Sequence, residues 1–137
     1  MDIREVTPGF AVSPQIAVED IKALAEKGYV AIVCNRPDGE EPGQPPLGDL
    51  RAAANDAGLA FHHIPVAGGA FPDAAIAAFG AVRRGTKGPL LAYCRTGTRS
   101  ITLETLANPM GLSAEERLEQ AKAAGYDLSA LAPRLGG

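Results

Sequence analysis

A cysteine with two arginines and a serine close behind it stands out in the run CRTGTRS, residues 94–100. An apolar, strand-like run precedes Cys94, and a helix-like run follows Ser100. A thiol with an ordinary pKa of about 8.5 ionises at neutral pH when a helix N-terminus, backbone N–H groups and a guanidinium lie close to it. Arg99 can bind an oxyanion through two parallel hydrogen bonds, which a lysine cannot do. The run therefore predicts a nucleophilic Cys94 in an anion-binding loop.

The remaining residues of this run are predicted to shape the loop. Gly97 allows backbone conformations that turn N–H groups inward. Ser100 is placed either to hydrogen-bond the sulfur or to cap the following helix. Thr96 and Thr98 complete the predicted anion cradle, whereas Arg95 either joins it or faces solvent. The alternative for the cysteine is the ordinary role of a small buried hydrophobe at the end of a strand.

Alternating strand-like and helix-like segments must position this loop. Strand-like runs cover 29–34, 59–66 and 89–94, and helix-like runs that end at a glycine cover 18–28, 47–58 and 72–85. This alternation predicts right-handed βαβ units, and hence a three-layer α/β fold whose mainly parallel sheet is flanked by helices. The C-terminal third is predicted to be helical, with a capping box at Ser113 and Glu116 and a last short turn capped by Asp127. The length fits a single domain over 1–137.

The carboxyl edge of the predicted sheet gathers the unusual features of the chain. Cys34, the loop 35–46, the loop 66–72 and Cys94 all leave the sheet at this edge, where ligands of open α/β sheets bind. The loop 35–46 is rich in proline, glycine and acidic residues and is unusually long for such a connection. Its Arg36 either supplies a second cation to the site or lies on the surface. Cys34 is a candidate resolving thiol under oxidation.

Composition and charge exclude several function classes. The net charge of −3, without a basic run, gives no electrostatic support for nucleic-acid binding. We expect no signal peptide and no membrane span, because no apolar run has the required length. Two cysteines form neither a disulfide framework nor a zinc site, and His62 and His63 point to opposite faces of a strand, so no metal and no cofactor are expected. The chain is predicted to be cytoplasmic, and its alanine-rich helices leave a homo-oligomer open.

The spacing within the cysteine loop resembles that of two enzyme classes. Protein tyrosine and dual-specificity phosphatases carry five residues between Cys and Arg, followed by Ser or Thr. Rhodanese-type sulfurtransferases carry four, and four residues separate Cys94 from Arg99 here. A shorter loop makes a smaller cradle, which suits a persulfide sulfur better than a phosphoryl group.

Over nearly its full length the chain resembles a bacterial family, the β-lactamase hydrolase-like proteins, phosphatase-like domain. The resemblance lies in residues 13–45, 63–66, 93–100 and 124–131, and NRPDGEEPGQP is its most specific part. It implies a fold similar to that of dual-specificity phosphatases. Some members of the family are fused to a metallo-β-lactamase-type persulfide dioxygenase, which is therefore a candidate partner. No HxHxDH-type zinc signature occurs here, so the chain resembles the stand-alone domain.

A phosphatase also needs an acid to protonate the leaving oxygen. Dual-specificity enzymes take an aspartate from the loop after the preceding strand, but residues 67–69 hold no acid here. Asp73 follows Phe-Pro and is either this acid or the N-cap of the next helix. Asp38, Glu40 and Glu41 on the long loop are alternative acids.

Three functions follow from these residues. Sulfur transfer needs no acid and fits the short loop, so transfer of sulfane sulfur through a Cys94 persulfide is the leading expectation. The alternative is hydrolysis of phosphomonoesters through a Cys94 phosphothiolate. A non-catalytic anion-binding module, in which the thiol has its ordinary pKa, is the third. The predicted substrate is a small anion: a persulfide, thiosulfate or a phosphoester.

Overall fold

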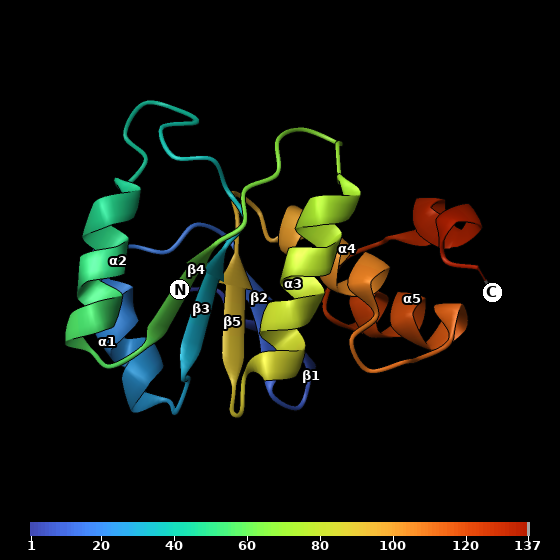
Figure 1. Cartoon of the computed structure of the whole chain (residues 1–137), viewed down its shortest axis with the longest axis horizontal. Coiled ribbons are helices and arrows are strands. Elements are labelled where there is room, and N and C mark those ends of the chain that lie inside the picture. The colour runs from blue at the N-terminus through green and yellow to red at the C-terminus, as the bar shows by residue number, and fades with distance from the viewer. Residues whose placement is uncertain (137) are drawn as a thin grey trace.

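The computed structural model describes residues 1–136, in which five strands form one sheet in the order β1-β2-β5-β3-β4 (Figure 1). The strands are β1 (Arg4–Thr7), β2 (Phe10–Ser13), β3 (Ala31–Cys34), β4 (Ala60–His63) and β5 (Leu90–Tyr93). Neighbouring strands run parallel, except that β1 pairs antiparallel with β2 at one edge. Cys34 lies opposite both Tyr93 and His63, so β3, β4 and β5 end level with one another. The loops that follow these three strands therefore start side by side.

Helices cover both faces of this sheet, which makes three layers (Figure 1). They are α1 (Val18–Glu26), α2 (Leu47–Asp56), α3 (Asp73–Gly85), α4 (Thr98–Ala107), α5 (Ala114–Ala123) and the short 3-10 helix η1 (Ser129–Arg134). α1 and α2 lie on one face, and α3, α4 and α5 lie on the other. The predicted α/β fold with a mainly parallel sheet flanked by helices is confirmed.

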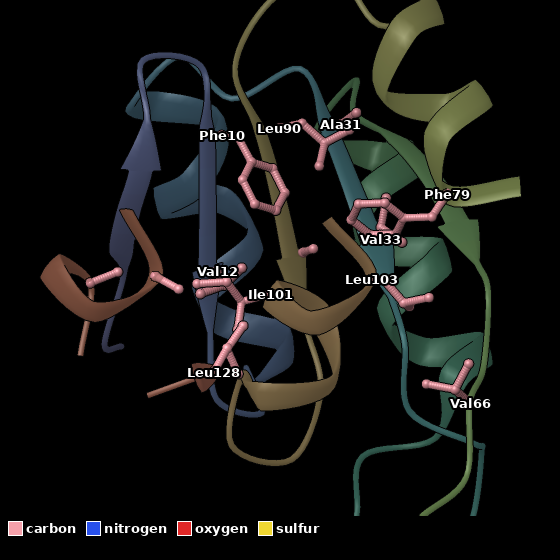
Figure 2. Packing of buried hydrophobic residues seen from close by; sticks show 13 residues of the cluster. Phe10, Val12, Ala31, Val33, Val66, Phe79, Leu90, Ile101, Leu103 and Leu128 are labelled. Atoms are coloured by element: carbon pink, nitrogen blue, oxygen red, sulfur yellow. The ribbon is translucent and has the colours of Figure 1, made fainter. Parts of the chain in front are cut away.

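The strands bury side chains on both faces, as parallel sheets covered by helices do. Toward α3 and α4 the packing cluster includes Phe10, Val12, Val33, Phe79, Leu90 and Ile101 (Figure 2). Toward α1 and α2 it includes Ile21, Leu24, Ile32, Leu50 and Leu91. The rings of Phe10 and Phe79 meet edge to face with centroids 6.1 Å apart. These two clusters fix the strand ends from which the site loops emerge.

The hairpin of β1 and β2 is the main element that the sequence analysis missed. Each strand has four residues, β1 carries the exposed charges of Arg4 and Glu5, and the turn bends at Gly9 with a φ of 88°. β3, β4 and β5 are equally short, but each follows a helix, whereas the described residues before β1 and β2 form none that would mark a βαβ unit. β2 nevertheless pairs with β5 along its whole length and so supports the strand that carries the cysteine loop.

The C-terminal expectations are confirmed in part: Ser113 caps α5, whereas the cap position of η1 is Leu128 and not Asp127. The Ser113 hydroxyl accepts a hydrogen bond from the Glu116 backbone N–H at 3.1 Å and caps α5. The Asp127 carboxylate accepts one from the Ser129 backbone N–H at 3.0 Å, at the start of η1. No described helix is both long and apolar enough to cross a bilayer. The assignment of the whole chain to one domain stays a prediction.

Candidate active site

Cys94 lies in a tight turn between β5 and α4. Its side chain is fully buried, and the Gly97 backbone N–H donates to its Sγ at 3.1 Å. Gly97 has a φ of 93°, the left-handed region that favours glycine, and α4 begins at the next residue. A side chain at position 97 would also collide with the Tyr126 hydroxyl. The glycine therefore turns an N–H group toward the sulfur, as the sequence predicts.

The first turn of α4 adds positive potential beside the sulfur. Because α4 starts at Thr98, its unpaired N–H groups and the positive end of its dipole lie next to Cys94. Ser100 lies in this first turn and is fully buried, and within residues 1–136 its hydroxyl has no hydrogen-bond partner. The helix is capped by Gly97 and not by Ser100, so the capping role predicted for Ser100 is wrong. The unpaired hydroxyl stays free to bond the sulfur or a bound group.

Arg99 binds a carboxylate, and this is the main surprise of the site. Its Nη1 and Nη2 donate to the two oxygens of Glu40, each at 2.8 Å. Nη1 also donates to the Val66 carbonyl oxygen at 2.8 Å. Glu40 lies 59 residues earlier, on the loop between β3 and α2. The guanidinium thus holds an anion through two parallel hydrogen bonds, which is the geometry that the sequence predicts for a substrate oxyanion.

Arg36 is a second cation at the same place. Its side chain is only 2% exposed, and its Nε donates to Glu40 at 2.8 Å. Its Nη2 donates to Glu41 at 2.7 Å, and its Nη1 donates to Gln15 at 3.0 Å. Of the two roles left open for Arg36, the structure excludes the solvent-exposed one. Glu40 is therefore shared by two guanidinium groups.

The hydrogen bonds from Arg99 and then from Arg36 lower the pKa of Glu40 from its ordinary value to about 2. Glu40 is consequently a carboxylate at neutral pH and, while it is paired in this way, carries no proton to donate. In turn, Glu40 is the largest cause that raises the pKa of Arg99, and the attraction of Cys94 adds to it.

These charged groups line a pocket of about 460 Å³ at the carboxyl edge of the sheet. Its lining residues are Arg36, Glu40, Glu41, Gly68, Arg95, Thr96, Thr98 and Arg99. Arg95, Thr96 and Thr98 therefore lie at the pocket, as the sequence predicts for an anion cradle. Three arginines against two glutamates leave the pocket with a positive excess, which suits an anionic ligand.

The structure places the predicted general acids in different surroundings. Asp73 is the first residue of α3, which is capped by Pro72, so the predicted N-cap role of Asp73 is wrong by one position. It is not among the residues that line the pocket. Asp38 accepts a hydrogen bond from the Leu47 backbone N–H at 3.0 Å and thereby tethers the long loop to the start of α2. Glu40 is the only one of the predicted acids that contacts Arg99 among the described residues.

Cys34 and His63 both contact the backbone of Arg36, a residue that lines the pocket. The Cys34 thiol is buried and donates to the Arg36 carbonyl oxygen at 3.4 Å, and burial raises its pKa. His63 Nε2 hydrogen-bonds the same carbonyl oxygen at 3.0 Å. Both side chains therefore fix the first residues of the long loop. The resolving-thiol role of Cys34 stays a prediction. Within residues 1–136 no group of three or more His, Cys, Asp or Glu could hold a metal ion.

Two residues that the sequence reasoning missed support the cysteine loop. The Tyr126 hydroxyl donates to the Thr96 carbonyl oxygen at 2.9 Å, and the Gln15 backbone N–H donates to the Arg95 carbonyl oxygen at 3.3 Å. Neither residue belongs to the run 94–100, and the local sequence around each contains no motif that marks it as part of the site. Both segments occur in the stretches that carry the family resemblance, and this was the one signal that pointed to them.

Comparisons with known proteins find relatives in sequence and in fold. A β-lactamase hydrolase-like protein of Xylella fastidiosa is 38% identical over 107 residues, which are 78% of this chain and 25% of that protein. The chain spans about a quarter of the length of the curated relatives that it matches. The crystal structure of a candidate phosphatase from Neisseria meningitidis is 33% identical, with a TM-score of 0.85 over 99% of this chain and 97% of that one.

A more distant structure, that of kinase associated phosphatase, shares the fold. Its TM-score is 0.76 at 16% identity, over 98% of this chain and 91% of that chain. The fold is therefore that of the cysteine phosphatases of dual-specificity type. The family described as "Beta-lactamase hydrolase-like protein, phosphatase-like domain" matches residues 2–111, and the chain belongs to this family.

Proposed function

We propose that this protein is a cysteine-dependent phosphatase that hydrolyses a phosphomonoester through a phosphothiolate on Cys94. The observation that carries the proposal is the bidentate binding of a carboxylate by Arg99 at the mouth of the cysteine loop. A phosphoryl group can present two oxygens to the same guanidinium. The phosphatase-like family and the fold give further support.

The proposed reaction has two steps. The Cys94 thiolate attacks phosphorus, and the phosphorus–oxygen bond to the leaving alcohol or phenol breaks with both electrons going to that oxygen. Water then attacks the phosphothiolate, the phosphorus–sulfur bond breaks, and inorganic phosphate and the thiolate are released. Arg99 and the N–H groups at the start of α4 stabilise the charge on the phosphoryl oxygens in both steps.

The acidity of the leaving group sets which esters react fastest. Glu40 is ionised in the resting site, and the loop 67–69 supplies no acid, so leaving groups depart with little protonation. Phenolates are weaker bases than alkoxides and need less help. Aryl phosphates are therefore the proposed substrate class.

The test is turnover of p-nitrophenyl phosphate by the wild-type chain, Cys94→Ser and Cys34→Ala. We expect Cys94→Ser to lose at least about 1,000-fold in kcat, whereas Cys34→Ala, which removes the other buried thiol, keeps most of it. Equal turnover by the wild-type chain and Cys94→Ser would refute the proposal.

Sulfur transfer is the second candidate, and the four-residue spacing between Cys94 and Arg99 favours it. From the sequence alone it is the leading expectation. The family and the matched structures are named for phosphatases, so they support the alternative better than this reading. A cyanide-sensitive gain of about 32 Da on Cys94 after exposure to thiosulfate or glutathione persulfide would establish sulfur transfer. A persulfide dioxygenase is the partner proposed under this candidate.

Alkylation of Cys94 distinguishes the non-catalytic alternative from the two catalytic functions. Iodoacetamide reacts with the thiolate, so its rate against pH reports the pKa of Cys94. A midpoint near 8.5 would favour a plain anion-binding module. A cytoplasmic location, freedom from cofactors and the oligomeric state stay predictions.

A further inference from the structure

The carboxylate of Glu40 is bound to the Arg99 guanidinium, the group proposed to bind the phosphoryl oxygens of the substrate. Both of its oxygens are bonded to Arg99, and Oε1 also accepts a hydrogen bond from the buried Arg36. The Arg99 and Glu40 side chains are 14% and 27% exposed, so this is not a loose surface ion pair. In this state the Nη1–Nη2 edge of the guanidinium, called the Arg99 fork below, is already filled by Glu40.

The long loop is built to present Glu40 in this position. The Gln44 side-chain oxygen accepts a hydrogen bond from the Glu40 backbone N–H at 3.0 Å, and its amide donates to the Pro37 carbonyl oxygen at 2.9 Å. Asp38 ties the same loop to the start of α2. Because Glu40 is tethered and held in place, it competes with free anions at an effective concentration of millimolar order or higher.

We infer that Glu40 is an internal ligand of Arg99 that determines which anions the site accepts. This inference rests on the proposed function and deepens it. An anion replaces Glu40 only if it restores both hydrogen bonds to the guanidinium, which requires two terminal oxygens on one centre. Phosphoryl and sulfonyl groups meet this requirement. The single terminal sulfur of a persulfide does not, so Glu40 selects against it.

The neighbouring Glu41 provides a matched contrast. It lies on the same loop and lines the same pocket, but it bonds Arg36 and approaches Arg95 at 3.7 Å, and it makes no hydrogen bond to Arg99. Removing either glutamate makes the pocket more positive by the same amount. Only the removal of Glu40 frees the Arg99 fork.

The test measures anion binding without turnover, in the full chain carrying Cys94→Ser. Inorganic phosphate and thiocyanate, a linear anion with one terminal sulfur, are titrated calorimetrically into this protein and into its Glu40→Gln and Glu41→Gln derivatives. We expect Glu40→Gln to bind phosphate about tenfold more tightly and to gain binding of thiocyanate. We expect Glu41→Gln, which removes the same charge without freeing Arg99, to tighten phosphate binding less than Glu40→Gln and to gain no binding of thiocyanate. Equal or weaker phosphate binding by Glu40→Gln would overturn the inference.

A measurement on the unsubstituted chain guards against misfolding of the variants. The carboxyl carbon resonance of Glu40 should shift as phosphate is added and should saturate with the calorimetric Kd. A resonance that stays unchanged while phosphate binds would also overturn the inference. The proposed function fails separately: tighter phosphate binding by Glu40→Gln without Cys94-dependent turnover supports the internal ligand and refutes the phosphatase. Cys94-dependent turnover, together with a phosphate affinity that Glu40→Gln leaves unchanged, supports the phosphatase and refutes the internal ligand.

Discussion

At the scale of single residues, the site depends on the difference between arginine and lysine. The Arg99 guanidinium makes three hydrogen bonds from one nitrogen pair, two to the Glu40 carboxylate and one to the Val66 carbonyl oxygen. The carbonyl contact fixes the Nη1–Nη2 edge in the direction of the pocket, where it holds the Glu40 carboxylate. A lysine at this position has one ammonium group and cannot do both with the same geometry.

The substitution Arg99→Lys should therefore reduce kcat/KM for an aryl phosphate by about 100-fold or more, as the loss of one preorganised donor does elsewhere. The control is Arg84→Lys, an exposed arginine of α3, which should leave kcat/KM unchanged. Steady-state kinetics on the two variants decide the point. Full kcat/KM in Arg99→Lys would contradict this and show that the charge alone, and not the geometry of the guanidinium, matters.

Glu40 also links the site to the pH dependence of stability. Its pKa is lowered to about 2 in the folded chain from an ordinary value of 4.5, so its contribution to stability is complete above pH 4.5 and is lost as the pH falls toward 2. Between pH 6, above this window, and pH 3, within it, the wild-type chain should lose more free energy of unfolding than Glu40→Gln. The excess should be on the order of 1 kcal/mol. Urea unfolding at both pH values measures it, and parallel losses would contradict the pairing.

At the scale of elements, Gly97 lies between β5, the central strand of the sheet, and α4, the helix that carries Arg99. Gly97 ends the cysteine loop in a left-handed conformation, and any side chain there would meet Tyr126. The close approach of the C-terminal segment thus excludes every residue but glycine from this position. Gly97 therefore determines both the turn after Cys94 and the start of α4.

The substitution Gly97→Ala should therefore destabilise the chain by about 1–3 kcal/mol and remove most of the activity. Gly48→Ala is the matched control, because Gly48 lies in α2 and an added side chain meets nothing there. It should be neutral or stabilising by up to about 1 kcal/mol. Chemical denaturation of both variants checks this. A Gly97→Ala chain as stable as Gly48→Ala would contradict the geometry.

The elements also show how far the sequence could predict the structure. The strands β3, β4 and β5 and the helices between them could be predicted, because apolar periodicity and terminal glycines mark them locally. The pair of Glu40 with Arg99 could not, since the two residues lie 59 positions apart. Their contact depends on the way Gln44 and Asp38 fold the loop 35–46 over the site. Contacts of this kind leave no local pattern in one sequence.

At the scale of the whole molecule, the C-terminal segment supports the cysteine loop across the fold. The family match ends at residue 111, whereas Tyr126 reaches the Thr96 carbonyl oxygen from beyond that point. Figure 1 shows this C-terminal part on the same side of the sheet as α3 and α4. The segment therefore contacts the cysteine loop as well as packing with α5.

The substitution Tyr126→Phe should reduce stability by about 1 kcal/mol, the value of one hydrogen bond, and should lower kcat several-fold. The half-buried Tyr29 makes no side-chain hydrogen bond within residues 1–136, so Tyr29→Phe is the control and should leave kcat unchanged. Thermal unfolding and kinetics on both variants measure the two effects. A loss of stability without any change in kcat would limit Tyr126 to a structural role.

The most direct measurement is intact-mass spectrometry of the chain, quenched in acid during turnover of an aryl phosphate. The account predicts a gain of about 80 Da, one phosphoryl group, on Cys94, which is absent from Cys94→Ser and unaffected by Cys34→Ala. A chain that gains no phosphoryl group and hydrolyses no phosphoester, but gains one sulfur from thiosulfate on Cys94, would contradict it. The anion cradle would then serve sulfur transfer.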